Sequence, residues 1–378
     1  MSQAPRFYPL TVTRISPEAA GAVAITLAIP PELRDAFAFE AGQFVTVRAQ
    51  LQGQECRRSY SICSTPEVLQ AQGTITLGVR PVAGGVFSNW AAQVLQAGQS
   101  LDVMPPEGRF TVQRPRALHR VGFAAGSGIT PILSILTHTL HSSPVAKFTL
   151  VYGNRHMDSV MFNEALQDLK DRFPSRLTLI HVLSRQAQEV PLLEGRIDAD
   201  KVRAIMAALL PAASMDEVFI CGPEGMIEQS QAALLGAGVP AQRIHSERFV
   251  SPAAAPTPPT PPTPPTPSAP QPPEAHAPQA QADHEQTTAL TVVLDGKFYP
   301  LRMGPHEHVL DAALRAGLDL PWSCKGGVCC TCRAKVVQGT AEMDKNFTLE
   351  PWEMAQGFVL TCQARATSAQ LCVSFDER

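Results

Sequence analysis

Four cysteines in the last quarter of the sequence have the spacing of metal ligands. Cys324, Cys329 and Cys332 form a C-x4-C-x2-C array, and Cys362 follows after 29 intervening residues. This spacing matches the plant-type [2Fe-2S] pattern, in which four thiolates hold two irons. Gly326 lies inside the array, where a missing side chain lets backbone amides come close to the sulfurs.

Two other interpretations of these cysteines are a structural zinc site and buried free thiols. Zinc sites usually combine two close pairs of Cys or His, and a four-residue gap together with one distant cysteine fits that poorly. Buried thiols have no reason to repeat this array. Cys330 lies between two ligands, and we expect it to be a small packed residue that points away from the cluster.

A second group of residues could bind an anionic cofactor. Residues 58–61 have the form R-x-Y-S on an expected strand at 57–63, and Gly84, Gly85 and Ser88 follow in a turn before helix-like sequence. Backbone amides at such a helix start favour a pyrophosphate. Each motif alone is more often an exposed strand tyrosine or an ordinary Gly-Gly turn. Their order, with a nucleotide-binding pattern next, favours a cofactor site.

The nucleotide-binding pattern begins at a second glycine turn. Gly126, Gly128 and Pro131 give this turn a G-x-G-x-x-P form between an expected strand and an expected helix. The third glycine of the dinucleotide fingerprint is absent, so the turn alone is not a Rossmann match. A similar turn, CGPEGM at 221–226, ends another buried strand. In open parallel sheets, ligands bind at this carboxyl edge of the strands.

Short alternating segments must position the first cofactor site. Strand-like runs separated by Gly and Pro predict an antiparallel β-barrel or sandwich. The six runs are 11–15, 23–29, 43–49, 57–63, 73–80 and 100–106.

Strands that alternate with helices must position the nucleotide site. Apolar runs at 120–128, 147–155, 176–185 and 216–225 are followed by helical sequence. This alternation predicts an α/β parallel sheet that is covered on both faces.

A proline-rich spacer separates the cysteine array from the rest of the chain. Thirteen of the 27 residues at 252–278 are proline, and proline fixes the backbone dihedral and offers no donor. We expect a semi-rigid polyproline spacer of about 3.1 Å per residue, with a PxxP ligand for a partner domain as the alternative.

The composition allows several domains and excludes some functions. At 378 residues the chain predicts two or three domains. The net charge of -3 gives no basic surplus for nucleic acid or an anionic membrane. The N-terminus has no apolar signal core, so we expect a cytoplasmic protein whose grouped cysteines bind metal.

Together these residues resemble the ferredoxin-NADP reductase superfamily fused to a C-terminal plant-type [2Fe-2S] ferredoxin. In motif order they are most similar to the reductase subunits of phenylacetyl-CoA oxygenases (epoxidases). The resemblance covers almost the whole chain except the spacer. It implies four segments: an FAD-binding β-barrel at 1–114, an NAD(P)-binding α/β domain at 115–250, a linker at 251–288 and an α+β, β-grasp-like ferredoxin domain at 289–378.

The resemblance also implies roles for single residues. Arg58 would contact the flavin pyrophosphate, Tyr60 would pack on the isoalloxazine, and Ser61 would bond the hydride-accepting ring nitrogen. Ser61, Cys221 and Glu247 would be the catalytic residues. The remaining FAD contacts would be Ser59, Val79, Arg80, Gly85, Val86 and Ser88.

On the nucleotide side, the resemblance implies that the G-x-G-x-x-P turn holds the pyrophosphate and that Cys221 lies near the nicotinamide. Phe249 would cover the flavin face, or would anchor the end of the domain. The nucleotide contacts would be Gly126, Gly128, Thr130, Pro131, Arg155, Ser184, Arg185, Cys221, Gly222 and Pro223. Arginines at 155 and 185 suit a 2′-phosphate, which favours NADPH over NADH.

The implied function is a two-to-one electron converter. Electrons would pass from NAD(P)H through FAD and the [2Fe-2S] cluster, one at a time, to the oxygenase component of a phenylacetyl-CoA epoxidase. The alternatives are a reductase of a Rieske-type oxygenase (carnitine-, ketosteroid- or phthalate-like) and a redox-sensing flavin and iron-sulfur protein.

Overall fold

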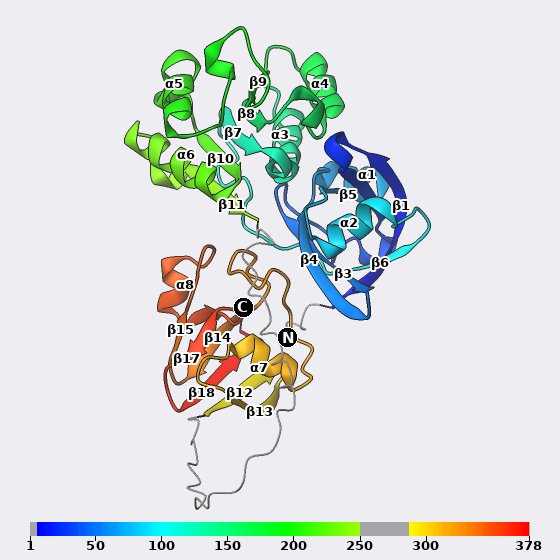
Figure 1. Ribbon diagram of the computed structural model, residues 1–378, viewed down its shortest axis with the longest axis vertical. Coiled ribbons are helices and arrows are strands. Elements are labelled where there is room, and N and C mark those ends of the chain that lie inside the picture. Colours follow the sequence, from blue (N-terminus) through cyan, green and yellow to red (C-terminus); the bar gives the residue numbers. More distant parts are fainter. Residues whose placement is uncertain (1–5, 250–286, 378) are drawn as a thin grey trace, which may run out of the picture.

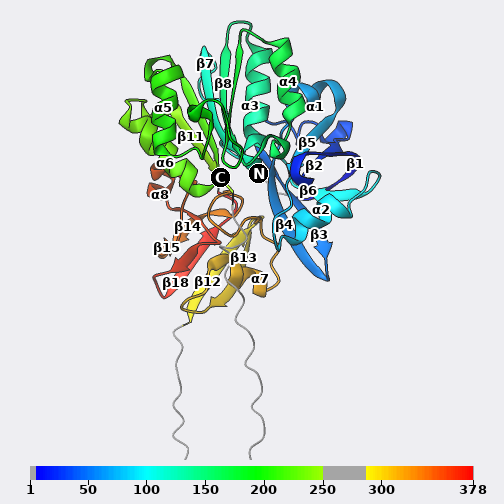
Figure 2. The same cartoon turned by 45° about the horizontal axis from the view of Figure 1, so that its top comes forward.

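The computed structural model describes residues 6–249 and 287–377, which form three bodies (Figures 1 and 2). The expected linker at 251–288 falls almost wholly outside these residues. Within the described ranges no helix combines the length and apolarity that crossing a membrane requires.

The N-terminal body is built on an antiparallel six-stranded sheet, as the alternating segments predict. Its strand order is β4-β3-β6-β1-β2-β5. A bridge between Ile62, just after β4, and Leu77 of β5 joins the two edges, so the sheet curls toward a barrel. The strands are β1 (Tyr8–Pro17), β2 (Val23–Ala28), β3 (Phe44–Leu51), β4 (Gln54–Ser61), β5 (Thr74–Val79) and β6 (Ser100–Val103), and the helices are α1 (Pro66–Gln72) and α2 (Val86–Gln93).

The middle body is a parallel five-stranded sheet in the order β11-β10-β7-β8-β9. Tyr152 packs with α3 and α4, whereas its neighbour Val151 packs with α5 and α6, so both faces are covered as predicted. The strands are β7 (His119–Ala125), β8 (Lys147–Asn154), β9 (Leu177–Leu183), β10 (Glu217–Gly222) and β11 (Ile244–Arg248). The helices are α3 (Ile129–Ser142), α4 (Asn163–Arg172), α5 (Ala199–Leu209) and α6 (Glu224–Gly236).

A buried carboxylate ties this sheet to the chain that arrives from the barrel. Glu217 at the start of β10 is fully buried and lies 3.0 Å from Nε of Arg120 on β7. It also accepts hydrogen bonds from the backbone amides of Gln113 and Arg114, at 2.7 and 3.2 Å. Pairing both charges avoids the large cost of an isolated buried ion. The contact therefore fixes how the two sheets meet.

The C-terminal body has the expected β-grasp-like α+β fold. Its mixed sheet has the order β13-β12-β18-β14-β16, with β12 and β18 parallel and the other pairs antiparallel. The strands are β12 (Thr288–Leu294), β13 (Lys297–Met303), β14 (Arg333–Gln338), β16 (Phe358–Leu360) and β18 (Gln370–Ser374), beside a ribbon of β15 (Ala341–Met343) and β17 (Ala364–Ala366). Helix α7 (Val309–Arg315) packs into the core, α8 (Pro351–Ala355) precedes β16, and the cysteine loop runs between α7 and β14.

Candidate redox sites

The four predicted cluster ligands lie together in the C-terminal body. Cys324, Cys329 and Cys332 come from the loop before β14, and Cys362 follows β16. The side chain of Cys324 hydrogen-bonds to those of Cys329 and Cys362, and Cys362 also contacts Cys332. These two hydrogen bonds hold the pKa of Cys324 well below the ordinary range of a thiol. The same hydrogen bonds raise the pKa of Cys329 and of Cys362, so these sulfurs lie close enough to share protons and to surround one cluster.

The loop around these thiols offers them backbone and side-chain donors. The amide of Gly326 donates to Sγ of Cys324 at 3.3 Å, and Nε2 of Gln363 donates to Sγ of Cys362 at 3.7 Å. At Gly327, where φ is +77°, a Cβ would lie 3.0 Å from the carbonyl oxygen of Lys345, so the loop needs glycine there. Donors of this kind tune iron-sulfur clusters.

The donor set consists of four thiols, which is the ligand number of a [2Fe-2S] cluster. Within the described residues, no group of three or more His, Cys, Asp or Glu side chains is placed as it would be around a metal ion, these four thiols included. A [2Fe-2S] cluster distributes its four thiolates over two irons. Cys330, between two of the predicted ligands, directs its thiol to the hydroxyl of Thr348 at 2.8 Å.

The three predicted catalytic residues meet where the first two bodies join. Ser61, at the end of β4, donates from Oγ to Oε2 of Glu247 at 3.0 Å, although 186 positions separate them in sequence. Glu247 on β11 pairs with Cys221 on β10 in the sheet. Desolvation raises the pKa of Glu247 to about 8, so this carboxyl holds a proton at neutral pH. Burial also raises the pKa of Cys221, and Glu247 adds to that rise.

The residues of the R-x-Y-S motif on β4 differ in exposure and in the groups that they contact. Arg58 is exposed, as an arginine that binds an external phosphate must be, and Tyr60 is half-buried with its ring 5.5 Å from that of Phe87. Desolvation raises the pKa of the Tyr60 phenol above its ordinary value, so it stays neutral. The hydroxyl of Ser59 pairs with Ser323 of the C-terminal body at 2.7 Å.

The glycine turn before α2 is tightly closed. A Cβ at Gly85 would lie 2.5 Å from Oγ of Ser88, which itself accepts a hydrogen bond from the amide of Val82 at 3.3 Å. Val86, the first residue of α2, is exposed, whereas Val79 is fully buried in the barrel core. The turn therefore leaves its helix start open to an anion.

Six of the ten predicted nucleotide contacts line one cleft of about 1980 Å³, whereas Gly128, Thr130, Pro131 and Cys221 do not. A Cβ on Gly128 would lie 2.1 Å from the carbonyl oxygen of Cys221, so only glycine lets the first turn approach β10. Thr130 and Pro131 are buried behind this turn. The predicted residues that line the cleft are Arg80, Gly126, Arg155, Ser184, Arg185, Gly222, Pro223 and Phe249.

The sequence matches three family descriptions in the order of the three bodies. These are the oxidoreductase FAD-binding domain at 14–112, the oxidoreductase NAD-binding domain at 123–232 and the 2Fe-2S iron-sulfur cluster binding domain at 292–367. The chain is also 40% identical, over 98% of both chains, to a 1,2-phenylacetyl-CoA epoxidase component from Escherichia coli (strain K12). The chain belongs to the ferredoxin-reductase family of oxygenase reductases with a fused [2Fe-2S] domain.

Other relatives and solved structures match nearly the whole length of this reductase. It is 35% identical to the ferredoxin reductase component of 3-ketosteroid-9-alpha-monooxygenase from Rhodococcus rhodochrous, over 97% of this chain and 96% of the other. The solved structure of phthalate dioxygenase reductase matches with a TM-score of 0.56 and 20% identity over 98% of both chains, which shows a shared fold. An intact type IV self-sufficient cytochrome P450 monooxygenase matches with a TM-score of 0.65 and 21% identity, over 98% of this chain and 41% of the other.

This reductase is therefore an NAD(P)H-dependent oxidoreductase of the oxygenase-reductase class, with FAD, a [2Fe-2S] cluster and a pyridine nucleotide. When bound, these groups supply hydride acceptance and single-electron transfer, and the chain supplies binding and orientation. The three bodies are accordingly called the FAD domain, the NAD domain and the ferredoxin domain, after the family matches at 14–112, 123–232 and 292–367 that fall within them.

Sequence motifs missed several residues at these sites. Arg196, in the loop before α5, lines the nucleotide cleft but belongs to no motif. Arg57 and Arg109 of the FAD domain contact Asp319 and Glu353 of the ferredoxin domain. Arg57 adjoins the R-x-Y-S motif, but only the fold reveals its partner.

We predict that the proton on Glu247 controls the rate at which NADPH bleaches the flavin. A buried carboxylate beside Ser61 would oppose the arrival of negative charge there, so the rate should fall as the pH rises through about 8. Glu247→Gln keeps a neutral side chain and should show a flat profile across this range. Stopped-flow absorbance in the band of the oxidised flavin measures both proteins.

The protonation of Glu247 should also make the stability of the fold depend on pH, which provides an independent check. Its folded pKa of about 8 lies above the reference value of 4.5, so the folded state binds more protons between these values and stability falls as the pH rises through that window. Glu247→Gln should lack this fall. A pH profile of bleaching that is identical in both proteins would contradict the assignment.

Proposed function

We propose that this reductase carries electrons from NADPH to the oxygenase component of a phenylacetyl-CoA epoxidase, as part of aromatic catabolism. The main support for the partner is the end-to-end similarity to the 1,2-phenylacetyl-CoA epoxidase component from Escherichia coli (strain K12), at 40% identity. The electron-transfer part of the proposal is supported by the geometry of a single cleft.

That cleft is bordered by side chains from all three domains. Arg80 comes from the FAD domain, Arg185 from the NAD domain, and Cys324 and Cys362 from the ferredoxin domain. A nucleotide, a flavin and a cluster held by these groups would adjoin one another without a second protein between them. This common border is the observation that carries the proposal.

Each domain contributes a defined task within the proposal. Arg58 and the turn at Gly85 bind the FAD pyrophosphate, and Tyr60 packs against the flavin ring. Ser61 and Glu247 hold a proton beside the ring, since Ser61 donates to a carboxyl whose pKa is raised to about 8. Cys324, Cys329, Cys332 and Cys362 hold the cluster.

The preference for NADPH rests on three arginines among the cleft residues. Arg155, Arg185 and Arg196 line the cleft together with Ser184, and the acidic Asp198 and Glu224 line it as well. Arginine offers a planar, bidentate contact to phosphate, and the hydroxyl of Ser184 donates to the backbone of Asn154 at 3.3 Å, which fixes its position. A 2′-phosphate would complement these three positive charges.

A second candidate acceptor is the oxygenase of a 3-ketosteroid-9-alpha-monooxygenase system, because a reductase component of that name is 35% identical over 97% of this chain.

We predict that this reductase, with NADPH, supports turnover of phenylacetyl-CoA by a phenylacetyl-CoA epoxidase oxygenase in a purified mixture, measured by product formation. Turnover with the ketosteroid oxygenase alone would overturn the choice of partner and leave the reductase assignment intact.

The redox centres themselves are tested by the spectrum of the purified protein. We predict combined flavin and [2Fe-2S] absorbance that NADPH bleaches, with NADH less effective at equal concentration. Cys329→Ser should remove the cluster features and keep the flavin bleaching, because Cys329 lies in the ferredoxin domain. Cys372→Ser, on β18 and outside the array, is the matched control and should retain both. Protein without flavin, or with a cluster that survives Cys329→Ser, would contradict the assignment.

A further inference from the structure

Strand β4, which carries the R-x-Y-S motif, directly contacts the domain that carries the cysteine loop. Arg57 is 3% exposed and donates from its two terminal nitrogens to that domain. One bond reaches the carbonyl oxygen of Leu320 at 2.9 Å, and the other reaches Oδ1 of Asp319 at 2.6 Å. The remaining nitrogen, Nε, donates to Glu55 of its own domain at 2.8 Å. Most of the hydrogen bonding of this buried cation therefore depends on the ferredoxin domain.

Aromatic and hydroxyl contacts extend this junction toward the cluster. The Arg57 guanidinium lies 5.0 Å from the ring centroid of Trp322, a distance typical of cation–π contacts. Two residues along β4, the hydroxyl of Ser59 pairs with that of Ser323 at 2.7 Å. Ser323 immediately precedes Cys324, the first predicted cluster ligand. The flavin strand and the cluster loop are thus joined by hydrogen bonds next to their functional residues.

A second charged contact lies on another side of the same junction. Arg109 of the FAD domain binds Glu353 of α8 with both terminal nitrogens, and NH2 donates to Oε1 at 2.7 Å. Glu353 is fully buried, and its Oε1 also lies 2.8 Å from Nε of Arg333 within the ferredoxin domain. A bidentate arginine fixes orientation as well as distance.

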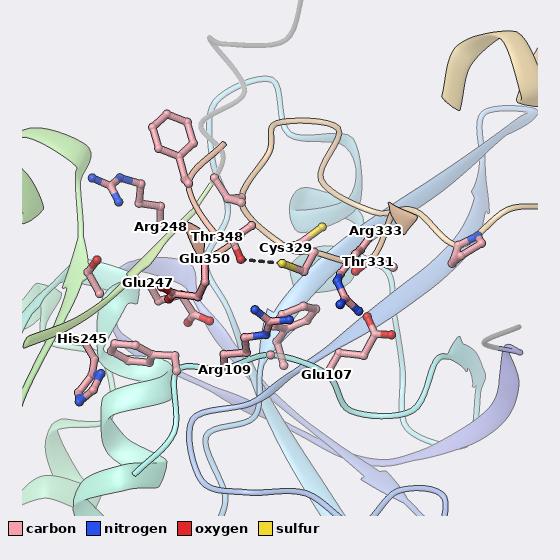
Figure 3. Close-up of a pocket in the computed structure, with 18 of the residues that line it drawn as sticks. Glu107, Arg109, His245, Glu247, Arg248, Cys329, Thr331, Arg333, Thr348 and Glu350 are labelled. Atoms are coloured by element: carbon pink, nitrogen blue, oxygen red, sulfur yellow. Dashed lines mark hydrogen bonds between the residues drawn. The ribbon is translucent and has the colours of Figure 1, made fainter. Parts of the chain in front are cut away.

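The side chains around Arg109 enclose a cavity of about 500 Å³ where the three domains meet (Figure 3). Cys329 and Thr331 of the cluster loop lie on its ferredoxin side, and Glu247 and Arg248 line it from β11. Figure 3 shows that these side chains surround a common hollow. The cluster loop is therefore turned toward the flavin half of the molecule.

We propose that Arg57 and Arg109 form a two-point clamp that docks the ferredoxin domain with its cluster loop against the flavin strand, and so position the two redox centres for electron transfer. The inference rests on the proposed function, since it requires a flavin and a cluster. Electron tunnelling slows steeply as the gap between two centres widens, so a clamp that selects the short-gap arrangement sets the rate. Both arginines act through the position of the domain.

The clamp has the properties of a reversible contact. Asp319 keeps 73% of its side chain exposed and Arg109 keeps 45%, so water can compete for both ion pairs. The ferredoxin domain is held on the same chain, and tethering keeps its effective concentration high after the contacts break. Salt should weaken such partly exposed pairs, which makes the docked fraction dependent on ionic strength.

The test is a single-turnover reaction of the full chain with NADPH, in which flavin bleaching and cluster reduction are followed separately. The test variants are Asp319→Ala, Arg109→Gln and their combination. Both replaced side chains are partly exposed, and Glu353 keeps its ion pair with Arg333 when Arg109 is replaced. The variants should therefore still fold. Arg315→Gln is the matched control, because Arg315 is also an exposed arginine and its ion pair, with Glu307 at 2.8 Å, lies within the ferredoxin domain.

We predict that cluster reduction slows about tenfold or more in the double variant, since loss of both ion pairs lowers the docked fraction. Flavin bleaching should be unchanged, and Arg315→Gln should match the native chain in both steps. Added salt should slow cluster reduction in the native chain and have little further effect in the double variant.

Two results would overturn the clamp. One is cluster reduction at the native rate in the double variant, and the other is a parallel loss of flavin bleaching, which would place these residues in the flavin site. Failure of the proposed function would look different, because the native chain itself would then lack flavin or cluster absorbance.

Discussion

The contact between strand β4 and the loop before Cys324 is the constraint on which the rest of the structure depends. Arg57 and Ser59 bind Asp319 and Ser323 across it, at 2.6 and 2.7 Å. At the end of β4, Ser61 reaches Glu247 of the NAD domain at 3.0 Å. One short strand therefore touches both neighbouring domains, and the flavin that it is expected to bind would lie between the nucleotide cleft and the cysteine loop.

The parts of the site that are local in sequence could be predicted from it. The C-x4-C-x2-C array predicts a loop, because a chain with ligands three and five residues apart can wrap around one cluster. The G-x-G-x-x-P spacing identifies Gly128 from the sequence. The structure explains why glycine is required at this position, since a Cβ there would lie 2.1 Å from the carbonyl oxygen of Cys221. Alternating and continuous apolar runs likewise predicted an antiparallel sheet followed by a parallel one.

Contacts between domains could not be predicted in this way. The motif predicts a flavin contact for Ser59, but it cannot predict that the hydroxyl of Ser59 pairs with that of Ser323, 264 positions away. Nothing in the local sequence distinguishes the buried Arg57 from the exposed Arg58, because the burial of Arg57 depends on residues 319–323 of a separate domain. Arg109 and Glu353 belong to no motif, and their pairing follows only from how the domains meet.

The central claim is that electrons pass from flavin to cluster within one chain. The most direct measurement is the rate constant of cluster reduction after mixing with saturating NADPH, taken over a roughly hundredfold range of protein concentration. A tethered, docked ferredoxin domain predicts a rate constant that does not change with dilution. A rate that falls in proportion to protein concentration would show that the cluster takes its electrons from another molecule, and would contradict the account.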